Sequence, residues 1–268
     1  MKRFEKDICY THELLNGKKS NDYSSVFYSS NERFAEILSD FLISNKSILS
    51  VAGSGDQAFY LYGLGASKVD LFDVNILSFY YFYLRLWTMI YLKKSYPDYF
   101  LNIKYIRDLL SIVVPSTHDE IEAYCYWNLF CNCFDDKCFD ALFVRSFLDV
   151  NSELFDEMNI YDRIIDWKPK FYHMNIIGKN KVKAKYDILY TSNISEYLCD
   201  CDDMEKYKKN IYKILNKTGT MIASNLLFSK PKDELKEVFS DKFEYFQLPV
   251  KNDNCLGFCF SKKRGIKE

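Results

Sequence analysis

Short apolar runs alternate along this chain with longer segments in which apolar residues recur every three or four positions. The short runs are typical of buried strands, and the longer segments are typical of helices that bury one side. This pattern predicts strands at Ser47–Ala52, Lys68–Asp73, Phe171–Ile176, Tyr186–Thr191, Thr218–Ser224, Phe243–Pro249 and Cys255–Ser261. It also predicts helices at Asp56–Leu64 and Asp203–Leu215, each between two of those strands. Alternating strands and helices predict an α/β fold with a parallel, doubly wound sheet.

The connection between the last two predicted strands is short. Its centre is the turn-like sequence Lys251-Asn252-Asp253-Asn254. Parallel strands need a crossover of about a dozen or more residues, so these two strands must be antiparallel. The predicted fold is therefore a mostly parallel, Rossmann-like sheet of about seven strands that ends in an antiparallel hairpin.

One long segment, from Ile76 to Lys170, interrupts the alternation between the second and third strands. Helices are predicted within it at Ile76–Ser95, Asp98–Val113, Thr117–Phe134 and Asp140–Leu148. We predict a single domain over residues 1–268, with residues 76–170 as a helical insertion. The first of these helices carries an aromatic stripe formed by Phe79, Tyr80, Phe82, Tyr83 and Trp87. Such a stripe is typical of core packing, with the wall of an acceptor pocket as the alternative.

Composition and charge narrow the class of protein. Of the 268 residues, 36 are Lys or Arg, 37 are Asp or Glu, and 18% are aromatic. The aromatic content argues against disorder, and the balanced charge argues against nucleic-acid binding. No apolar run is long enough to span a membrane, and the N-terminus lacks a secretory signal, so we expect a cytoplasmic protein. The nine cysteines form no Cys-x-x-Cys pair and the three histidines are dispersed, which predicts reduced thiols and no metal site.

The strongest motif is a Gly-x-Gly turn, Gly53 to Gly55, which follows the first predicted strand and opens a helix. Glycines allow positive φ angles there and let a ligand approach the backbone without meeting a Cβ atom. The N–H groups at the start of the helix suit a carboxylate or a phosphate. Asp73 ends the second strand, where a carboxylate is placed to accept both hydroxyls of a ribose. The two elements together predict a site for a ribose-containing cofactor.

Two features favour S-adenosylmethionine over a dinucleotide. Asp56 directly follows the second glycine, where a carboxylate is poorly placed for a pyrophosphate but suits a ligand that carries an ammonium and a sulfonium. The usual dinucleotide folds do not require the C-terminal antiparallel hairpin. The alternative is a nicotinamide cofactor, because Gly53-x-Gly55-x-x-Ala58 with Asp73 also satisfies the dinucleotide fingerprint.

These motifs make the chain resemble the class I S-adenosylmethionine-dependent methyltransferases, and among them the branch of betaine-lipid 3-amino-3-carboxypropyl transferases. The resemblance covers roughly residues 29–224 and rests on four motifs: Ser30-Asn31-Glu32, Ser50 to Asp56, Asp73-Val74-Asn75 and Thr191-Ser192-Asn193. It implies that the glycine loop and Asp73 bind S-adenosylmethionine, with Asn193 at the methionine end. The chain is shorter than the betaine-lipid enzymes and has few basic residues to hold an anionic membrane, so we expect a small-molecule acceptor rather than a lipid.

Further polar residues follow predicted strands at their carboxyl ends, where open α/β sheets bind their ligands. Asn193 is expected to hold the methionine group or a substrate amine, with a helix cap for Ile194–Leu198 as the alternative. Glu196 and Tyr197 are expected to face the same crevice, and with Asn193 they are the predicted catalytic residues. Asn175, near the end of the third strand, is expected to reach the adenine edge.

Asn31 and Glu32 precede an expected helix at Phe34–Phe41 and are predicted to form a lid over the cofactor, with a surface capping pair as the alternative. The predicted cofactor-binding residues are Asn31, Glu32, Ala52, Gly53, Ser54, Gly55, Asp56, Asp73, Val74, Asn75, Asn175, Ser192 and Asn193. The sequence thus predicts a transferase that moves a methyl or 3-amino-3-carboxypropyl group from S-adenosylmethionine. The alternatives are an NAD(P)-dependent oxidoreductase and a non-catalytic nucleotide-binding protein that uses its aromatic insertion to bind a partner.

Overall fold

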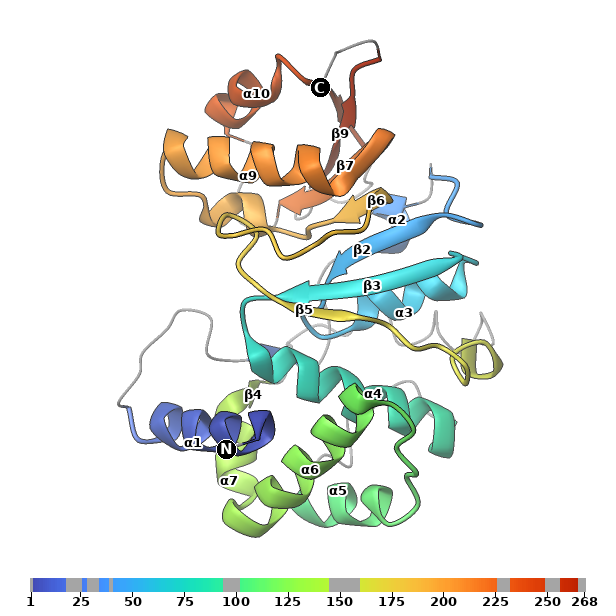
Figure 1. Ribbon diagram of the computed structural model, residues 1–268, viewed down its shortest axis with the longest axis vertical. Helices are drawn as coiled ribbons and strands as arrows, with labels where there is room; N and C mark the ends of the chain where they lie inside the picture. Colours follow the sequence, from blue (N-terminus) through green and yellow to red (C-terminus); the bar gives the residue numbers. More distant parts are fainter. Residues whose placement is uncertain are drawn as a thin grey trace. The chain divides into compact units, whose positions relative to one another are not determined.

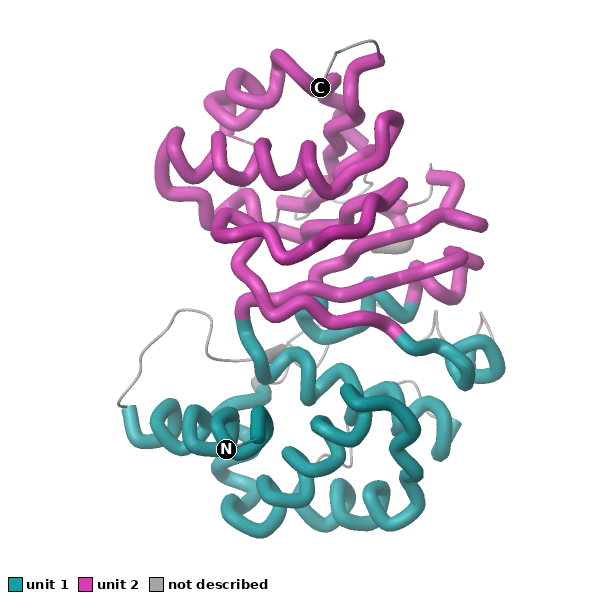
Figure 2. Tube along the Cα trace, viewed as in Figure 1, with its two compact units in different colours: residues 1–31, 52–59, 75–168 teal, residues 32–51, 60–74, 169–268 magenta. Residues whose placement is uncertain are grey.

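A computed structural model gives the structure of the chain and describes residues 2–17, 26–27, 34–38, 41–93, 102–144, 160–225, 232–248 and 256–264. Contacts group the chain into two compact units, which Figure 2 shows in different colours. The first unit comprises residues 1–31, 52–59 and 75–168, and the second comprises residues 32–51, 60–74 and 169–268. A single domain with an insertion at residues 76–170 stays a prediction.

The second unit is built on a seven-stranded sheet, most of whose strands are labelled in Figure 1. They are β2 (Ser47–Val51), β3 (Lys68–Asp73), β5 (Phe171–His173), β6 (Tyr186–Tyr190), β7 (Leu215–Asn225), β8 (Phe243–Gln247) and β9 (Leu256–Lys262). The order across the sheet is β5-β3-β2-β6-β7-β9-β8. Neighbouring strands from β5 to β7 are parallel, whereas β9 runs antiparallel to β7 and to β8. The predicted Rossmann-like, mostly parallel sheet with an antiparallel C-terminal hairpin is confirmed.

The helices of the second unit are α2 (Phe34–Leu38), the 3-10 helix η2 (Ile194–Tyr197), α9 (Cys201–Ile214) and α10 (Asp233–Phe239). A buried apolar cluster joins Tyr207 of α9 and Phe239 of α10 to Met221 of the sheet, so these two helices cover one sheet face. Helix α9 begins where the Asp200 carboxylate accepts a hydrogen bond from the Asp203 N–H (2.8 Å). Helix α3 (Asp56–Gly63) connects β2 to β3 along the chain.

The first unit is mainly helical. It contains α1 (Arg3–Leu15), α4 (Ile76–Leu92), α5 (Ile103–Leu110), α6 (His118–Cys133), α7 (Asp136–Leu142), the 3-10 helix η1 (Ile160–Asp162) and the short parallel strands β1 (Val26–Phe27) and β4 (Phe143–Val144). Side chains of Asn75, Asn102, Thr117 and Asp135 cap the N-termini of α4, α5, α6 and α7. Across the described ranges, no helix combines the length and the apolar character that crossing a membrane requires.

The aromatic stripe of α4 is core of the first unit. Phe79, Tyr80 and Phe82 are fully buried. The Tyr80 ring stacks on Tyr126 of α6 with 3.7 Å between ring centroids, and the Trp127 indole N–H donates to the Tyr80 carbonyl oxygen (2.8 Å). Stacked rings with a satisfied indole are the packing expected of a dry interior. Of the two readings of the stripe, the structure therefore bears out core packing.

Several element boundaries differ from those that the sequence pattern predicts. The helix expected at Asp140–Leu148 instead begins at Asp136, because the Asp135 carboxylate accepts from the Cys138 N–H (2.9 Å). The strand expected from Thr218 begins at Leu215, directly after α9, and the strand expected to run to Ile176 ends at His173. Helices α1 and α10 were not predicted. Parts of the expected elements lie outside the described residues, namely 39–40, 94–95, 98–101, 145–148, Pro249 and Cys255.

Candidate functional site

The Gly-x-Gly loop belongs to the first unit and leads from Ala52 into α3. Gly53 has φ +48° and Gly55 has φ +92°, and the Gly55 N–H donates to the Ala52 carbonyl oxygen (2.6 Å). A Cβ atom at Gly55 would lie 3.0 Å from a Phe59 ring carbon and 3.2 Å from a Phe82 ring carbon. At Gly53, no described atom would lie within 4 Å of a Cβ atom. Gly55 therefore serves internal packing, whereas Gly53 keeps a space open beside the backbone.

A buried ion pair holds this loop inside the first unit. The guanidinium of Arg85, from α4, pairs with the Asp56 carboxylate, and both side chains are at most 2% exposed. The same Arg85 Nη1 donates to the Ser54 carbonyl oxygen (3.0 Å), and the Ser54 hydroxyl donates to Asp56 Oδ2 (3.2 Å). Because a buried carboxylate is stable only when it is paired and hydrogen-bonded, Arg85 is what allows an acid at this position.

The ion pair changes the role expected of Asp56. Its carboxylate was predicted to lie near a cationic ligand, and in the structure it accepts from Arg85 and Ser54 instead. Asn75, another predicted cofactor residue in the first unit, accepts a hydrogen bond from the Leu77 N–H (2.9 Å) and caps α4. Arg85 is not among the site residues predicted from the sequence, although a lone charge inside the apolar α4 segment is a signal for it.

In the second unit, the carboxyl edge of the parallel strands carries Asp73 and Val74. Val51, the last residue of β2, pairs with Phe72, so β2 ends at the edge where Asp73 ends β3. The Asp73 side chain is largely buried, and its carbonyl oxygen accepts from the Met174 N–H (2.8 Å). Val74 is 39% exposed. This edge offers a largely buried carboxylate and an accessible apolar side chain, which suit a ribose and a base.

The end of β6 adds Ser192 and Asn193 to the same edge. Ser192 has φ +53°, which is uncommon for a residue other than glycine, and its carbonyl oxygen accepts from the Ser224 N–H of β7 (3.1 Å). The Ser192 hydroxyl donates to Asn193 Oδ1 (3.3 Å). Asn193 precedes η2 but makes no side-chain cap hydrogen bond, so the alternative role of a helix cap is not borne out.

The remaining predicted residues are spread along the second unit. Glu196 is half-buried in η2, and Tyr197, at the end of η2, is 47% exposed. Asn175 is exposed, and its Oδ1 accepts from the Ile177 N–H (3.0 Å) in the turn after β5. Asn31 and Glu32 lie outside the described residues. The second unit thus gathers Asp73, Val74, Ser192 and Asn193 at one edge of its sheet, as predicted from the strand ends.

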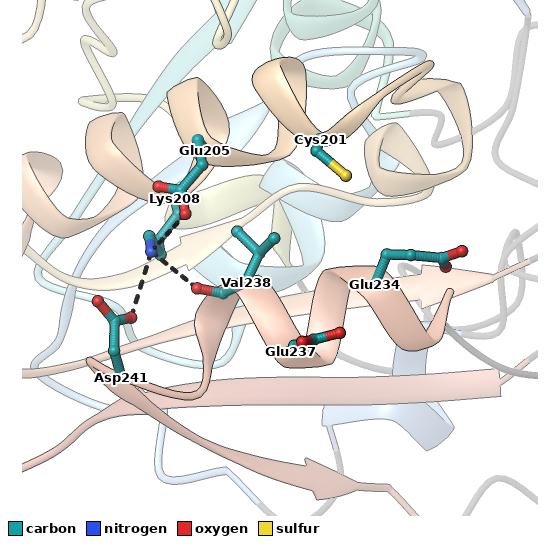
Figure 3. Close-up of a pocket in the computed structure, with 7 residues that line it drawn as sticks. All are labelled: Cys201, Glu205, Lys208, Glu234, Glu237, Val238 and Asp241. Carbon is teal, nitrogen blue, oxygen red and sulfur yellow. Dashed lines mark hydrogen bonds and ion pairs between the residues drawn. The ribbon is translucent and has the colours of Figure 1, made fainter.

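A separate hollow of about 450 Å³ lies between α9 and α10 and is shown in Figure 3. The Lys208 side chain lines this hollow. Its ammonium pairs with Glu205 (2.9 Å) and Asp241 (3.2 Å) and donates to the Val238 carbonyl oxygen (2.8 Å). These three bonds satisfy the ammonium within the protein, so the lysine links the two helices. Among the described residues, no group of His, Cys, Asp and Glu side chains is placed to hold a metal ion.

No protein-family model and no curated protein matches the chain. Solved structures do match it. The glycopeptide N-methyltransferase MtfA complexed with S-adenosyl-L-methionine is 10% identical over 91% of this chain and 100% of that chain, with a TM-score of 0.49. N-methyltransferase NodS from Bradyrhizobium japonicum WM9 is 11% identical over 94% and 98%, with a TM-score of 0.44. A TehB-like SAM-dependent methyltransferase from Corynebacterium glutamicum is 11% identical over 96% and 97%, also at 0.44. At these identities and scores, the likeness says nothing about what this chain binds.

Proposed function

We propose that this protein is an S-adenosylmethionine-dependent transferase that moves a methyl or 3-amino-3-carboxypropyl group to a small-molecule acceptor. The observation that carries the proposal is Asp73 at the carboxyl end of β3, beside the strand that leads into the Gly53 turn. Gly53 adds a second observation, because a Cβ atom there would occupy space that no described residue fills. The ribose of S-adenosylmethionine suits Asp73, and its carboxylate suits the turn at Gly53.

Each part of the site is assigned one role in this proposal. Asp73 accepts the two ribose hydroxyls, and Val74 lies against the base. Gly53 allows close approach to the backbone, and the N–H groups that open α3 face the carboxylate of the methionine chain. Arg85 and Asp56 hold the loop in its conformation from within the first unit. Ser192 and Asn193 are assigned to the methionine end.

The sheet order favours S-adenosylmethionine over a dinucleotide. Numbered along the chain, the sheet strands lie in the order 3-2-1-4-5-7-6, whereas the dinucleotide-binding order is 3-2-1-4-5-6. The charge of Asp56 no longer contributes to this choice, because Arg85 neutralises it. The non-catalytic alternative uses the aromatic insertion to bind a partner, and the α4 stripe within that insertion is buried.

S-adenosylmethionine, which Asp73 and the Gly53 turn would hold, would supply an electrophilic carbon on a sulfonium to the acceptor's lone pair, with the neutral thioether as the leaving group. The protein aligns the acceptor in line with the reacting carbon and excludes water, which accounts for much of such a rate. For an amine acceptor the proton is released to water, and for a hydroxyl acceptor we assign it to Glu196. Tyr197 and Asn193 orient the acceptor. The carbon that faces the acceptor decides between methyl and aminocarboxypropyl transfer. Resemblance to the betaine-lipid branch favours aminocarboxypropyl transfer, whereas the prevalence of methyl transfer across the superfamily favours a methyl group.

Thermal unfolding with four ligands tests the proposal. S-adenosylmethionine, S-adenosylhomocysteine and methylthioadenosine are each expected to raise the Tm in proportion to the logarithm of concentration above Kd, and NAD is not. Stabilisation by NAD alone would overturn the proposal. In a turnover assay with candidate acceptors, release of methylthioadenosine indicates aminocarboxypropyl transfer, and release of S-adenosylhomocysteine indicates methyl transfer.

A further inference from the structure

Two buried polar side chains at the carboxyl edge of the second unit accept no hydrogen bond from the described protein. Asn225, the last residue of β7, is 2% exposed, and its Oδ1 atom has no partner. Ser195, in η2, is 3% exposed, and its Oγ atom has no partner. Buried polar groups are almost always hydrogen-bonded, and an unsatisfied one costs stability, so a pair of them in one place calls for a partner from outside the chain.

Both side chains belong to the same wall. Helix η2 packs against β7, and the Ser224 N–H donates to the Ser192 carbonyl oxygen (3.1 Å), which ties the end of β7 to the start of the η2 turn. Alternate residues of a strand share a sheet face, so Asn225 shares the face of Met221 and Ala223. Those two residues belong to the buried cluster against which Ile194 of η2 packs.

The local backbone also marks this wall as a built feature. Ser192 holds a left-handed conformation, φ +53°, at the point where the chain leaves β6 for η2. Residues other than glycine adopt this conformation at a cost, and such strain is concentrated at ligand-binding sites. The strained turn sets the position of η2, and with it Ser195, beside the end of β7.

We propose that Asn225 Oδ1 and Ser195 Oγ form the acceptor subsite of the proposed transferase, and that they hold the N–H or O–H group of an amine or alcohol acceptor. An amide oxygen accepts hydrogen bonds and does not donate them, so it selects a ligand group that carries a proton. Acceptors without such a proton, such as ethers and tertiary amines that lack other donors, leave Oδ1 unpaired and bind poorly. This inference rests on the proposed function and names its substrate class.

Matched small probes test the subsite without knowledge of the natural acceptor. 1-Butanol and methyl propyl ether are isomers that differ in the O–H donor, and butylamine presents N–H donors. Each is titrated into isotopically labelled protein, with and without saturating S-adenosylhomocysteine, while the backbone amide shifts of Ser195 and Asn225 are followed by NMR. The wild type is expected to bind 1-butanol and butylamine roughly 5- to 150-fold more tightly than the ether, because the ether leaves a buried acceptor unpaired.

Two variants make the test specific. Asn225→Leu and Ser195→Ala remove the unpaired atoms and are expected to reduce the preference for 1-butanol over the ether, while the Kd for S-adenosylhomocysteine stays within about twofold. Neither variant is expected to lose stability in the free protein, because each removes an unsatisfied buried atom. Asn210→Leu is the matched control, since Asn210 Nδ2 donates to the carbonyl oxygens of Ile176 (2.7 Å) and Gly178 (2.8 Å) and its loss destabilises the fold.

The outcomes separate this inference from the proposed function. Equal binding of alcohol and ether by the wild type, or an unchanged preference in both variants, overturns the subsite and assigns the two atoms to a bound water. If S-adenosylhomocysteine does not bind, the proposed function is overturned. The preference for 1-butanol over the ether in the ligand-free protein then tests whether Asn225 and Ser195 bind a donor group at all. A preference that both variants reduce supports Asn225 and Ser195 as a binding site for a donor group, and together with binding of S-adenosylhomocysteine it supports the acceptor subsite.

Discussion

Replacing Arg85 with methionine isolates the buried ion pair that supports the glycine loop. Methionine keeps much of the side-chain length but removes the guanidinium that pairs with the buried Asp56 carboxylate. Removing one partner of a buried ion pair costs about 3–5 kcal/mol. Native domains have a total stability of about 5–15 kcal/mol, so the expected loss is a large share of it.

Urea unfolding followed by circular dichroism measures the effect, with equal m values as the check that the variants unfold in the same way. Asp56→Asn completes a double-mutant cycle, because it removes the charge that Arg85 compensates. The double variant is expected to be at least about 2 kcal/mol more stable than the sum of the two single losses predicts. Arg85→Lys keeps the charge without the planar fork and is expected to fall between wild type and Arg85→Met. A loss below about 1 kcal/mol in Arg85→Met, or additive losses in the cycle, would refute the ion pair as the support of the loop.

Three further predictions follow. Gly53→Ala is expected to cost only about 1–2 kcal/mol of stability, from its left-handed backbone, yet to abolish cofactor binding measured by calorimetry. Gly55→Ala is expected to destabilise the fold more in urea unfolding, because its Cβ meets two aromatic rings as well; equal stability of the two variants would contradict this. Burial acts to raise the pKa of Glu120, but Lys168 and hydrogen bonds from the preceding turn outweigh it and lower the pKa from 4.5 to about 2. Because the pKa of Glu120 is lower in the folded than in the unfolded protein, its ionised carboxylate stabilises the fold at pH values above the unfolded pKa, and this stabilisation is lost as the pH falls. The difference in free energy of unfolding between wild type and Glu120→Gln should therefore shrink from pH 5 to pH 2. A difference that does not change with pH would contradict this prediction.

Local signals in the sequence were enough for the sheet and for the residues at its strand ends. The short connection through Lys251 to Asn254 determined the antiparallel hairpin, because no crossover fits it. Gly53, Gly55 and Asp73 stand next to the ends of apolar runs, so their positions follow from the strands themselves.

What the sequence did not reveal depends on contacts between distant residues. Asp56 and Arg85 lie 29 positions apart, and their pairing is set by how α4 packs within the first unit. Ser195 and Asn225 stand out only because each has a buried polar atom without a hydrogen-bond partner among the described residues, and a sequence pattern cannot show this. Helix α1 was missed because its apolar face is short, and its contacts with α6, such as Thr11 with Tyr126 (3.0 Å), are long-range.

The affinity for S-adenosylhomocysteine in wild type and Asp73→Asn, measured by titration calorimetry, tests the central proposal most directly. Asparagine keeps the shape of the side chain but removes the charge and one acceptor for the ribose hydroxyls, so the affinity is expected to fall about tenfold or more. Asp202→Asn is the matched control, because Asp202 is an exposed residue of α9, and it should bind as the wild type does. Equal affinity in wild type and Asp73→Asn, or no binding to the wild type at all, would contradict the proposed site.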